Sequence, residues 1–248
     1  MGDSIHDPTS QQYKVQRTAP PMFRIKICGI TRVDDAMAVI DAGADCIGLN
    51  FYKGSPRRVD LERASEIRQA VGNHLLVAGV FVNARTDRIV ETAHKLALDI
   101  IQLSGHETPD DVAALAIELS GTPVMQALRA KGTGLTEVRA HLDECRRLVC
   151  LPRLVLWDAY DPKEFGGTGR VANWDSAAEF VRAAGLPPLI LAGGLRAENV
   201  AEAIAAVQPL GVDTASGVET APGVKNAEKL RSFVAAARAA FDKTGTPD

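Results

Sequence analysis

Short runs of Val, Ile and Leu alternate along this chain with segments whose apolar residues recur at helical spacing, and this alternation is the strongest constraint on its fold. A short continuous apolar run is typical of a strand in a parallel sheet that is covered on both faces. Because strands and helices alternate strictly, the strands are expected to be parallel. The predicted strands are 24–28, 45–51, 75–82, 99–103, 123–128, 153–158, 188–192 and 210–214.

The segments between the strands predict helices. Apolar side chains follow the i, i+3, i+4, i+7 spacing of one helical face in segments 33–40, 112–119, 200–207 and 230–237. Thr31 with Asp34 resembles a capping box in which Asp replaces Glu. The other predicted N-cap residues are Asp60, Thr86, Thr108 and Thr136.

The number of strand–helix units favours one closed fold. About eight units suit a closed (β/α)8 barrel, the TIM barrel, as a single α/β domain. The alternative is an open, doubly wound sheet, which would carry a G-x-G-x-x-G turn after its first strand. Here Cys28-Gly29-Ile30-Thr31 occupies that turn. The barrel is therefore predicted over residues 23–242, with a disordered polar tail at 1–22 and a C-terminal tail at 243–248.

Charge and composition exclude several other classes. The 248 residues include 28 basic and 31 acidic residues with no long basic run, so nucleic acid is not an expected partner. No apolar stretch approaches the roughly 18 residues that a membrane span needs, so no membrane association is expected either. The 4 cysteines form no C-x-x-C pair, which favours reduced thiols and a cytoplasmic location.

The barrel prediction directs the search for a site to the C-terminal ends of the strands, where TIM-barrel active sites lie. In the first strand, alternation places Lys26 and Cys28 on the inner face. The Cys28 thiolate would then act as a base or nucleophile, favoured by Lys26 and by the N-terminus of the next helix. The alternative is a small buried apolar residue. We expect Lys26 to pair with Asp213, because an unpaired buried charge is costly.

Two other charged residues follow strands. Arg57 comes after the second strand in the sequence SPRR and is a candidate to bind a carboxylate through its guanidinium fork. Its alternative is a solvated surface turn. Asp158 ends the sixth strand on the inner-facing side and is a candidate general acid or base. Its alternative is a helix-capping or salt-bridged aspartate.

Two glycine turns predict a phosphate site. They follow the seventh and eighth strands, the positions at which TIM barrels often bind phosphate through backbone N–H groups and helix N-termini. The glycine-rich loop at 161–169, after the sixth strand, is a candidate to close over the ligand or present N–H groups to it. The predicted phosphate-binding residues are Gly166, Gly167, Gly169, Gly193, Gly194, Ser216 and Gly217.

Neither a metal nor a cofactor is expected. The 5 histidines show no H-E-x-x-H or H-x-H spacing, and neither a Walker A sequence nor a G-x-S-x-G turn is present. His106 follows the fourth strand and is a candidate to line the mouth of the barrel.

Seven segments at successive strand ends share their order with a known family. They are KICGIT at 26–31, FYxxSPR at 51–57, GVFVN at 79–83, QLSG at 102–105, FGGTG at 165–169, LAGGL at 191–195 and VDTASGVE at 212–219. Together they resemble phosphoribosylanthranilate isomerase, a family of tryptophan biosynthesis, over residues 24–240.

The resemblance implies a reaction and roles for residues. The family converts N-(5-phosphoribosyl)anthranilate into 1-(2-carboxyphenylamino)-1-deoxyribulose 5-phosphate by an Amadori rearrangement, without metal or cofactor. By resemblance, Asp158 is the general acid, Cys28 the general base and Arg57 the residue near the anthranilate carboxylate. The glycines of the three loops then cradle the phosphate of a small phosphosugar substrate. The chain is expected to be a monomer or a homodimer.

The chain departs from the family pattern at two positions. Ser104 stands where QLHG is common, and Asn50 stands where an apolar residue is common. Two alternative functions stay open. One is a different phosphosugar barrel, such as an indole-glycerol-phosphate synthase-like lyase or a ribulose-phosphate epimerase-like enzyme, whose catalytic lysine or metal-binding histidines are not found here. The other is a phosphate-binding scaffold without catalysis.

Overall fold

The computed structural model describes residues 22–119, 121–128, 135–158 and 173–244. Strands and helices alternate as predicted, and each barrel strand begins one residue after its predicted start. The elements are β1 (Ile25–Cys28), α1 (Val33–Ala42), β2 (Cys46–Asn50), α2 (Leu61–Val71), β3 (Leu76–Phe81), α3 (Thr86–Leu96), β4 (Ile100–Leu103), α4 (Pro109–Glu118), β5 (Val124–Leu128), α5 (Thr136–Arg147), β6 (Leu154–Trp157), α6 (Trp174–Arg182), β7 (Leu189–Leu191), α7 (Val200–Val207), β8 (Gly211–Thr214), η1 (Ser216–Val218), β9 (Glu219–Ala221), β10 (Val224–Lys225) and α8 (Ala227–Thr244).

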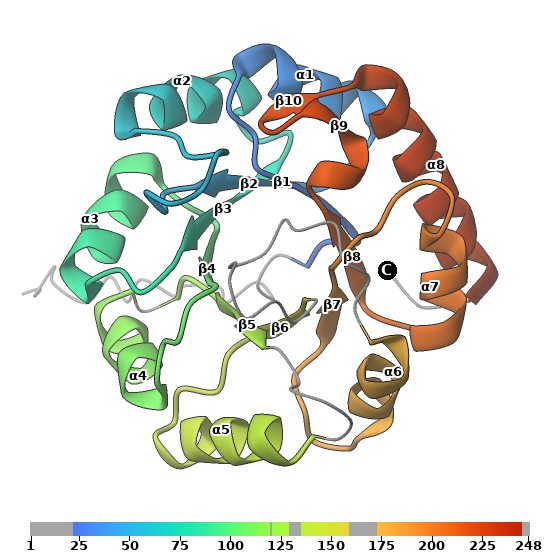
Figure 1. Cartoon of the computed structure of the whole chain (residues 1–248). Coiled ribbons are helices and arrows are strands. Elements are labelled where there is room, and N and C mark those ends of the chain that lie inside the picture. Colours follow the sequence, from blue (N-terminus) through green and yellow to red (C-terminus); the bar gives the residue numbers. More distant parts are fainter. Residues whose placement is uncertain (1–21, 120, 129–134, 159–172, 245–248) are drawn as a thin grey trace, which may run out of the picture.

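The strands β1 to β8 close into a parallel barrel, and helices α1 to α8 surround it (Figure 1). Closure is the pairing of β8 with β1, in which Lys26 lies opposite Asp213. The TIM-barrel prediction is confirmed and the open-sheet alternative is wrong. Among the described residues, no helix is both long enough and apolar enough to cross a membrane.

Alternation along the strands separates two layers of core. Side chains at one parity fill the barrel interior, and those at the other parity pack beneath the helices. In β6, for example, Leu156 faces the interior, whereas Trp157 packs outward against Phe180 of α6 with ring centroids 5.4 Å apart. The inner cluster is Phe23, Cys46, Ala78, Ile100, Met125, Ala127, Leu154, Leu156, Ile190 and Ala192.

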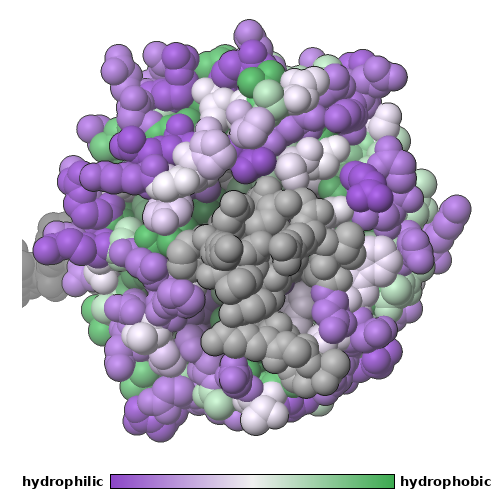
Figure 2. Space-filling view, in the orientation of Figure 1, coloured by the Kyte–Doolittle hydropathy of each residue, from purple (hydrophilic) through white to green (hydrophobic). Residues whose placement is uncertain are grey.

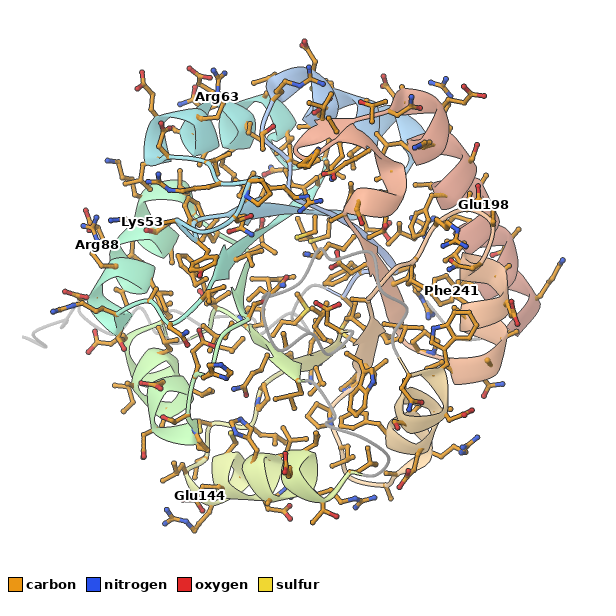
Figure 3. The ribbon with its side chains drawn as sticks, viewed as in Figure 1. Lys53, Arg63, Arg88, Glu144, Glu198 and Phe241 are labelled. Atoms are coloured by element: carbon orange, nitrogen blue, oxygen red, sulfur yellow. The ribbon has the colours of Figure 1, made fainter. Side chains whose placement is uncertain are left out.

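Charged side chains lie on the outer faces of the helices. Hydrophilic residues cover most of the outer edge of the molecule in Figure 2. In Figure 3, Arg63, Arg88 and Glu144 extend outward from α2, α3 and α5. Their ion pairs are local, as in the pair of Arg63 with Glu66 one helical turn away, 2.5 Å apart. Such exposed pairs contribute little to stability.

Two of the predicted N-caps are confirmed. The Asp60 side chain accepts a hydrogen bond from the backbone N–H of Arg63, and Thr108 forms a capping box before α4. Thr86 and Thr136 are instead the first residues of α3 and α5.

The predicted capping box at Thr31 is wrong. The hydroxyl of Thr31 donates to the carbonyl oxygen of Gly223 at 2.6 Å, and Arg32 precedes α1 without a side-chain cap. The reason is tertiary, since Gly223 lies in the β9–β10 hairpin that the sequence pattern did not predict.

The barrel begins with β1, and α8 continues to Thr244, two residues past the predicted boundary at 242. Residues 1–21 of the predicted N-terminal tail and 245–248 of the C-terminal tail lie outside the described residues.

The predicted pair of Lys26 and Asp213 is present inside the barrel. Lys26 is fully buried, and its Nζ donates to Asp213 Oδ1 at 2.9 Å. Burial by itself would lower the pKa of Lys26, but Asp213, together with Cys28 and Cys46, outweighs it and raises that pKa above its usual value. Lys26 therefore stays charged throughout the neutral range, and its counter-ion is the carboxylate on the strand that closes the barrel.

We expect Asp213→Asn to destabilise the fold by about 3–5 kcal/mol, because it leaves the ammonium of Lys26 buried without a counter-ion. Urea unfolding followed by circular dichroism measures the change. Glu66→Gln, which breaks the exposed pair with Arg63, is the control and should cost below about 1 kcal/mol. Equal losses in the two variants would contradict a special role for the buried pair.

Candidate active site

The C-terminal ends of the parallel strands gather polar residues at one end of the barrel. Cys28 is the last residue of β1, Asp158 directly follows β6, and the glycine turns follow β7 and β8. In the closed order, β8 and β7 lie between β1 and β6. The two turns therefore sit on the rim between the thiol and the carboxyl group.

The Cys28 side chain faces the barrel interior, as predicted. A Cβ placed on Gly48 of β2 would lie 2.8 Å from Cys28 Sγ and 3.0 Å from Lys26 Nζ, so both side chains occupy the space that this glycine leaves open. Cys28 is partly exposed, whereas the other cysteines are buried. Gly48 was not predicted as a site residue; its signal is a glycine at an inner-facing position of a strand.

The electrostatics of Cys28 correct one expectation. Burial raises the pKa of the thiol and outweighs the nearby ammonium groups of Lys26 and Lys225, which lower it; Asp213 raises it further. Lys26 does favour the thiolate, as predicted, but the pKa of Cys28 is raised overall. Most of the protein at neutral pH therefore carries the Cys28 thiol.

Asp158 continues the inner-facing alternation of β6. Leu154 and Leu156 belong to the cluster inside the barrel, and Asp158 is two residues further along the same face. The residue is partly exposed. Its position at the strand end matches the prediction, and its role as a general acid stays a prediction.

Arg57 lies in the loop after β2 and is not a solvated surface residue. It is 8% exposed, and its Nε and Nη2 donate to the carboxylate of Glu219 at 2.9 Å and 2.8 Å. Burial by itself would raise the pKa of Glu219, but Arg57 and Lys225 outweigh it and hold that pKa below its usual value. The guanidinium fork therefore binds a carboxylate of the protein itself, which the sequence did not predict, and contact with a substrate carboxylate stays a prediction.

The two predicted phosphate turns are brought together. Gly193 and Gly194 have φ values of 83° and 63°, which favour glycine. The hydroxyl of Thr214, at the end of β8, donates to the carbonyl oxygen of Leu195 at 2.7 Å. A Cβ on Gly217 would overlap the same oxygen, so the two turns are in direct contact.

The remaining predicted glycines, Gly166, Gly167 and Gly169, lie outside the described residues. At the two positions that depart from the family pattern, the side chains contact the protein. Ser104 is buried and accepts a hydrogen bond from Gln102 Nε2 at 3.0 Å. Asn50 Oδ1 accepts one from the Tyr52 N–H at 2.9 Å.

No cluster of three or more His, Cys, Asp or Glu side chains suited to a metal ion occurs among the described residues. His106 is exposed, and its backbone N–H donates to Asn83 Oδ1 at 2.7 Å. The polar groups of the site are thus thiol, carboxyl, ammonium and backbone N–H groups, which suit proton transfer on an anionic ligand.

The closed barrel and the polar residues at the C-terminal ends of its strands define a TIM barrel with a polar site at its mouth. The chain belongs to the N-(5'-phosphoribosyl)anthranilate isomerase family, whose pattern matches residues 25–236. It is therefore an isomerase of tryptophan biosynthesis, and the expectation drawn from the seven motifs is confirmed.

Relatives and solved structures agree. The N-(5'-phosphoribosyl)anthranilate isomerase of Geotalea uraniireducens is 43% identical over 217 residues, which are 88% of this chain and 99% of that protein. The crystal structure of the Thermus thermophilus enzyme has a TM-score of 0.75 at 32% identity and covers 87% of this chain and 98% of its own. A second crystal structure, of phosphoribosyl anthranilate isomerase in complex with reduced 1-(o-carboxyphenylamino)-1-deoxyribulose 5-phosphate, has a TM-score of 0.72 at 30% identity and covers 88% of this chain and 100% of its own.

We expect Gly217→Ala to weaken the binding of inorganic phosphate at least about tenfold, which is close to the value of one hydrogen bond to a charged group. The reason is that the new Cβ would overlap the Leu195 carbonyl oxygen and force the two turns apart. Titration calorimetry measures the affinity, and circular dichroism checks that the variant is folded. An unchanged affinity in a folded variant would argue against a phosphate site at these turns.

We expect the alkylation of Cys28 by iodoacetamide to keep accelerating above roughly pH 8.5, the usual pKa of a thiol. Only the thiolate reacts, and burial raises the pKa of Cys28, so the rate should rise tenfold per pH unit until that higher pKa is reached. Peptide mass spectrometry identifies the modified residue, with Cys28→Ser as the control. A plateau below pH 8 would contradict the direction of the shift.

Proposed function

We propose that the chain catalyses the Amadori rearrangement of N-(5'-phosphoribosyl)anthranilate to 1-(2-carboxyphenylamino)-1-deoxyribulose 5-phosphate, with Asp158 as general acid and Cys28 as general base. The observation that carries the proposal is the inward-facing, partly exposed thiol at the end of β1, separated from Asp158 by the two glycine turns. Membership of the isomerase family supports the choice of substrate.

In the first step Asp158 donates a proton to the furanose ring oxygen. The C1'–O bond of the ring breaks, and the nitrogen lone pair forms the C1'=N bond of a Schiff base. The acid must hold its proton until the substrate binds.

In the second step the Cys28 thiolate removes the proton from C2'. The electron pair of that C–H bond forms C1'=C2', and the C=N pair returns to nitrogen, which gives an enolamine. Tautomerisation yields the ketose, so no atom or electron is gained or lost overall. Burial makes the thiolate scarcer but also more basic, which suits removal of a weakly acidic proton.

Residues around the mouth of the barrel orient the substrate. Phosphate is held by N–H groups of the turns at Gly193–Gly194 and Ser216–Gly217, together with the loop that carries Gly166, Gly167 and Gly169. The anthranilate carboxylate lies toward Arg57, on the far side of β1 from β8. A ligand fixed at both ends presents its sugar to Cys28, and such fixation removes much of the entropic barrier.

The enzyme is expected in the cytoplasm, as a monomer or homodimer, with no metal or cofactor in the reaction. The alternative of a phosphate-binding scaffold differs in one measurable property, since it would bind phosphosugars without turnover.

We expect Cys28→Ser and Asp158→Ala each to lower turnover at least about a hundredfold, the range of one general acid or base. The fluorescence decay of freshly made phosphoribosylanthranilate reports the rate, with and without a chelator, and no effect of the chelator is expected. Binding of the reduced product analogue should persist in both variants.

Asp242→Ala, at an exposed position of α8, is the matched control and should keep the parent rate. A near-parental rate in either site variant would remove that residue from its proposed role. Binding without turnover in the parent protein would favour the scaffold.

A further inference from the structure

Lys225 is a buried charged residue that the sequence pattern did not assign to any role. It ends β10, the second strand of a hairpin that follows β8 and lies between α1 and α8 (Figure 1). The residue is 6% exposed, and its ammonium group is fully enclosed. Its backbone N–H donates to Asp35 of α1 at 3.2 Å, so its main chain is anchored as well.

The ammonium of Lys225 has an acceptor for each of its three protons. Its Nζ donates to the carbonyl oxygen of Cys28 at 2.6 Å, to that of Ala215 at 3.1 Å and to Glu219 Oε1 at 2.8 Å. Two of these acceptors belong to the backbone of the proposed site. One is the carbonyl of the proposed base, and the other directly precedes the turn at Ser216–Gly217.

The Cys28 carbonyl lies where the chain turns away from the sheet. The N–H groups of Gly29 and Ile30 both donate to the Gly48 carbonyl oxygen, at 2.9 Å and 3.1 Å. Gly29 has a φ of 75° and is packed so closely against the Arg57 side chain that a Cβ there would overlap it. Lys225 therefore holds one side of this turn, and Arg57 packs against the other.

Glu219 joins the two cations that enclose the turn. Its carboxylate accepts from Arg57 and from Lys225, and also from the Gly223 N–H at 3.2 Å. Burial lowers the pKa of Lys225, and Glu219 opposes that shift. The cluster connects the loop after β2, the end of β1 and the segment after β8.

The charged groups that face Cys28 come from three strands. They are Lys26 on β1, Asp213 on β8 and Lys225 on β10. Lys26 is already neutralised by Asp213, at 2.9 Å, and Lys225 shares Glu219 with Arg57. Of the two cations that face Cys28, Lys225 is therefore the one that shares its carboxylate with another cation.

We propose that Lys225 is a positioning residue for Cys28: its ammonium fixes the backbone of the thiol relative to the turn at Ser216–Gly217 and favours the thiolate. The role of Cys28 as a general base rests on the proposed function. The contacts of Lys225, and its effect on the thiol, do not depend on that function.

The test compares Lys225→Met with Lys229→Met. Methionine keeps the length and apolar stem of lysine and removes the three N–H donors. Lys229 is the matched control, because its Nζ also donates to the backbone of this hairpin, at Glu219 O and 2.8 Å, but it is an exposed residue of α8 outside the contacts of Cys28. Lys225→Met should move the pH profile of Cys28 alkylation upward by at least about half a unit and lower kcat at least about tenfold. Lys229→Met should match the parent in both measurements.

Lys225→Gln keeps the proposal testable where the methionine variant fails to fold. Glutamine retains two N–H donors without the charge, so it should fold, still shift the alkylation profile upward, and lose less kcat than methionine. An alkylation profile that superimposes on that of the parent, in whichever of the two variants folds, would overturn the proposal.

The alkylation readout separates this inference from the proposed function. Activity that survives in Cys28→Ser would reject the base assignment, whatever Lys225 does. An inactive Cys28→Ser together with an unshifted alkylation profile in the Lys225 variants would reject only the positioning role.

Discussion

The ion pair of Lys26 and Asp213 is the interaction on which both the barrel and its site depend. The two residues face each other across the β1–β8 pairing that closes the barrel. A charge this deeply buried is tolerated only with a close counter-ion, so the pair penalises any other register of these two strands. The same register places Cys28, two residues after Lys26, at the mouth of the barrel. One contact thus fixes both closure and the position of the thiol.

Local patterns were enough to predict the barrel and the orientation of its inner residues. Apolar runs indicate the strands, and alternation along the first strand places Lys26 and Cys28 on one inner face. Position along the strands then led to the choice of Asp158 and the glycine turns as site residues, and their roles stay predictions. The barrel and its inner face could be predicted because they depend on residues that are neighbours in sequence, or on the repeated geometry of a closed barrel.

The partners of the loops could not be predicted in the same way. Arg57 and Glu219 are 162 positions apart, and Lys225 reaches Cys28 across 197. A carboxylate-binding role for Arg57 followed from its chemistry, but the sequence does not reveal that a carboxylate of the same chain occupies part of its fork. Thr31 fails as a cap for a related reason, since its hydroxyl bonds to the distant Gly223. Tertiary contacts override local propensity where loops meet.

The two cations that face Cys28 are neutralised differently. Lys26 pairs with Asp213, whereas Lys225 shares Glu219 with Arg57. Burial raises the pKa of the thiol, and the ammonium groups of Lys26 and Lys225 oppose that shift without abolishing it.

Around the rim, the order of Arg57, Cys28, the two glycine turns and Asp158 has a chemical consequence. Under the proposed function, a single ligand held at the turns by its phosphate would lie between the thiol and the carboxyl group, so the proposed proton donor and acceptor would approach its sugar from different sides. Lys225 bonds to the backbone at both Cys28 and Ala215, so in the positioning role proposed for it these contacts set the spacing between the thiol and the β8 turn.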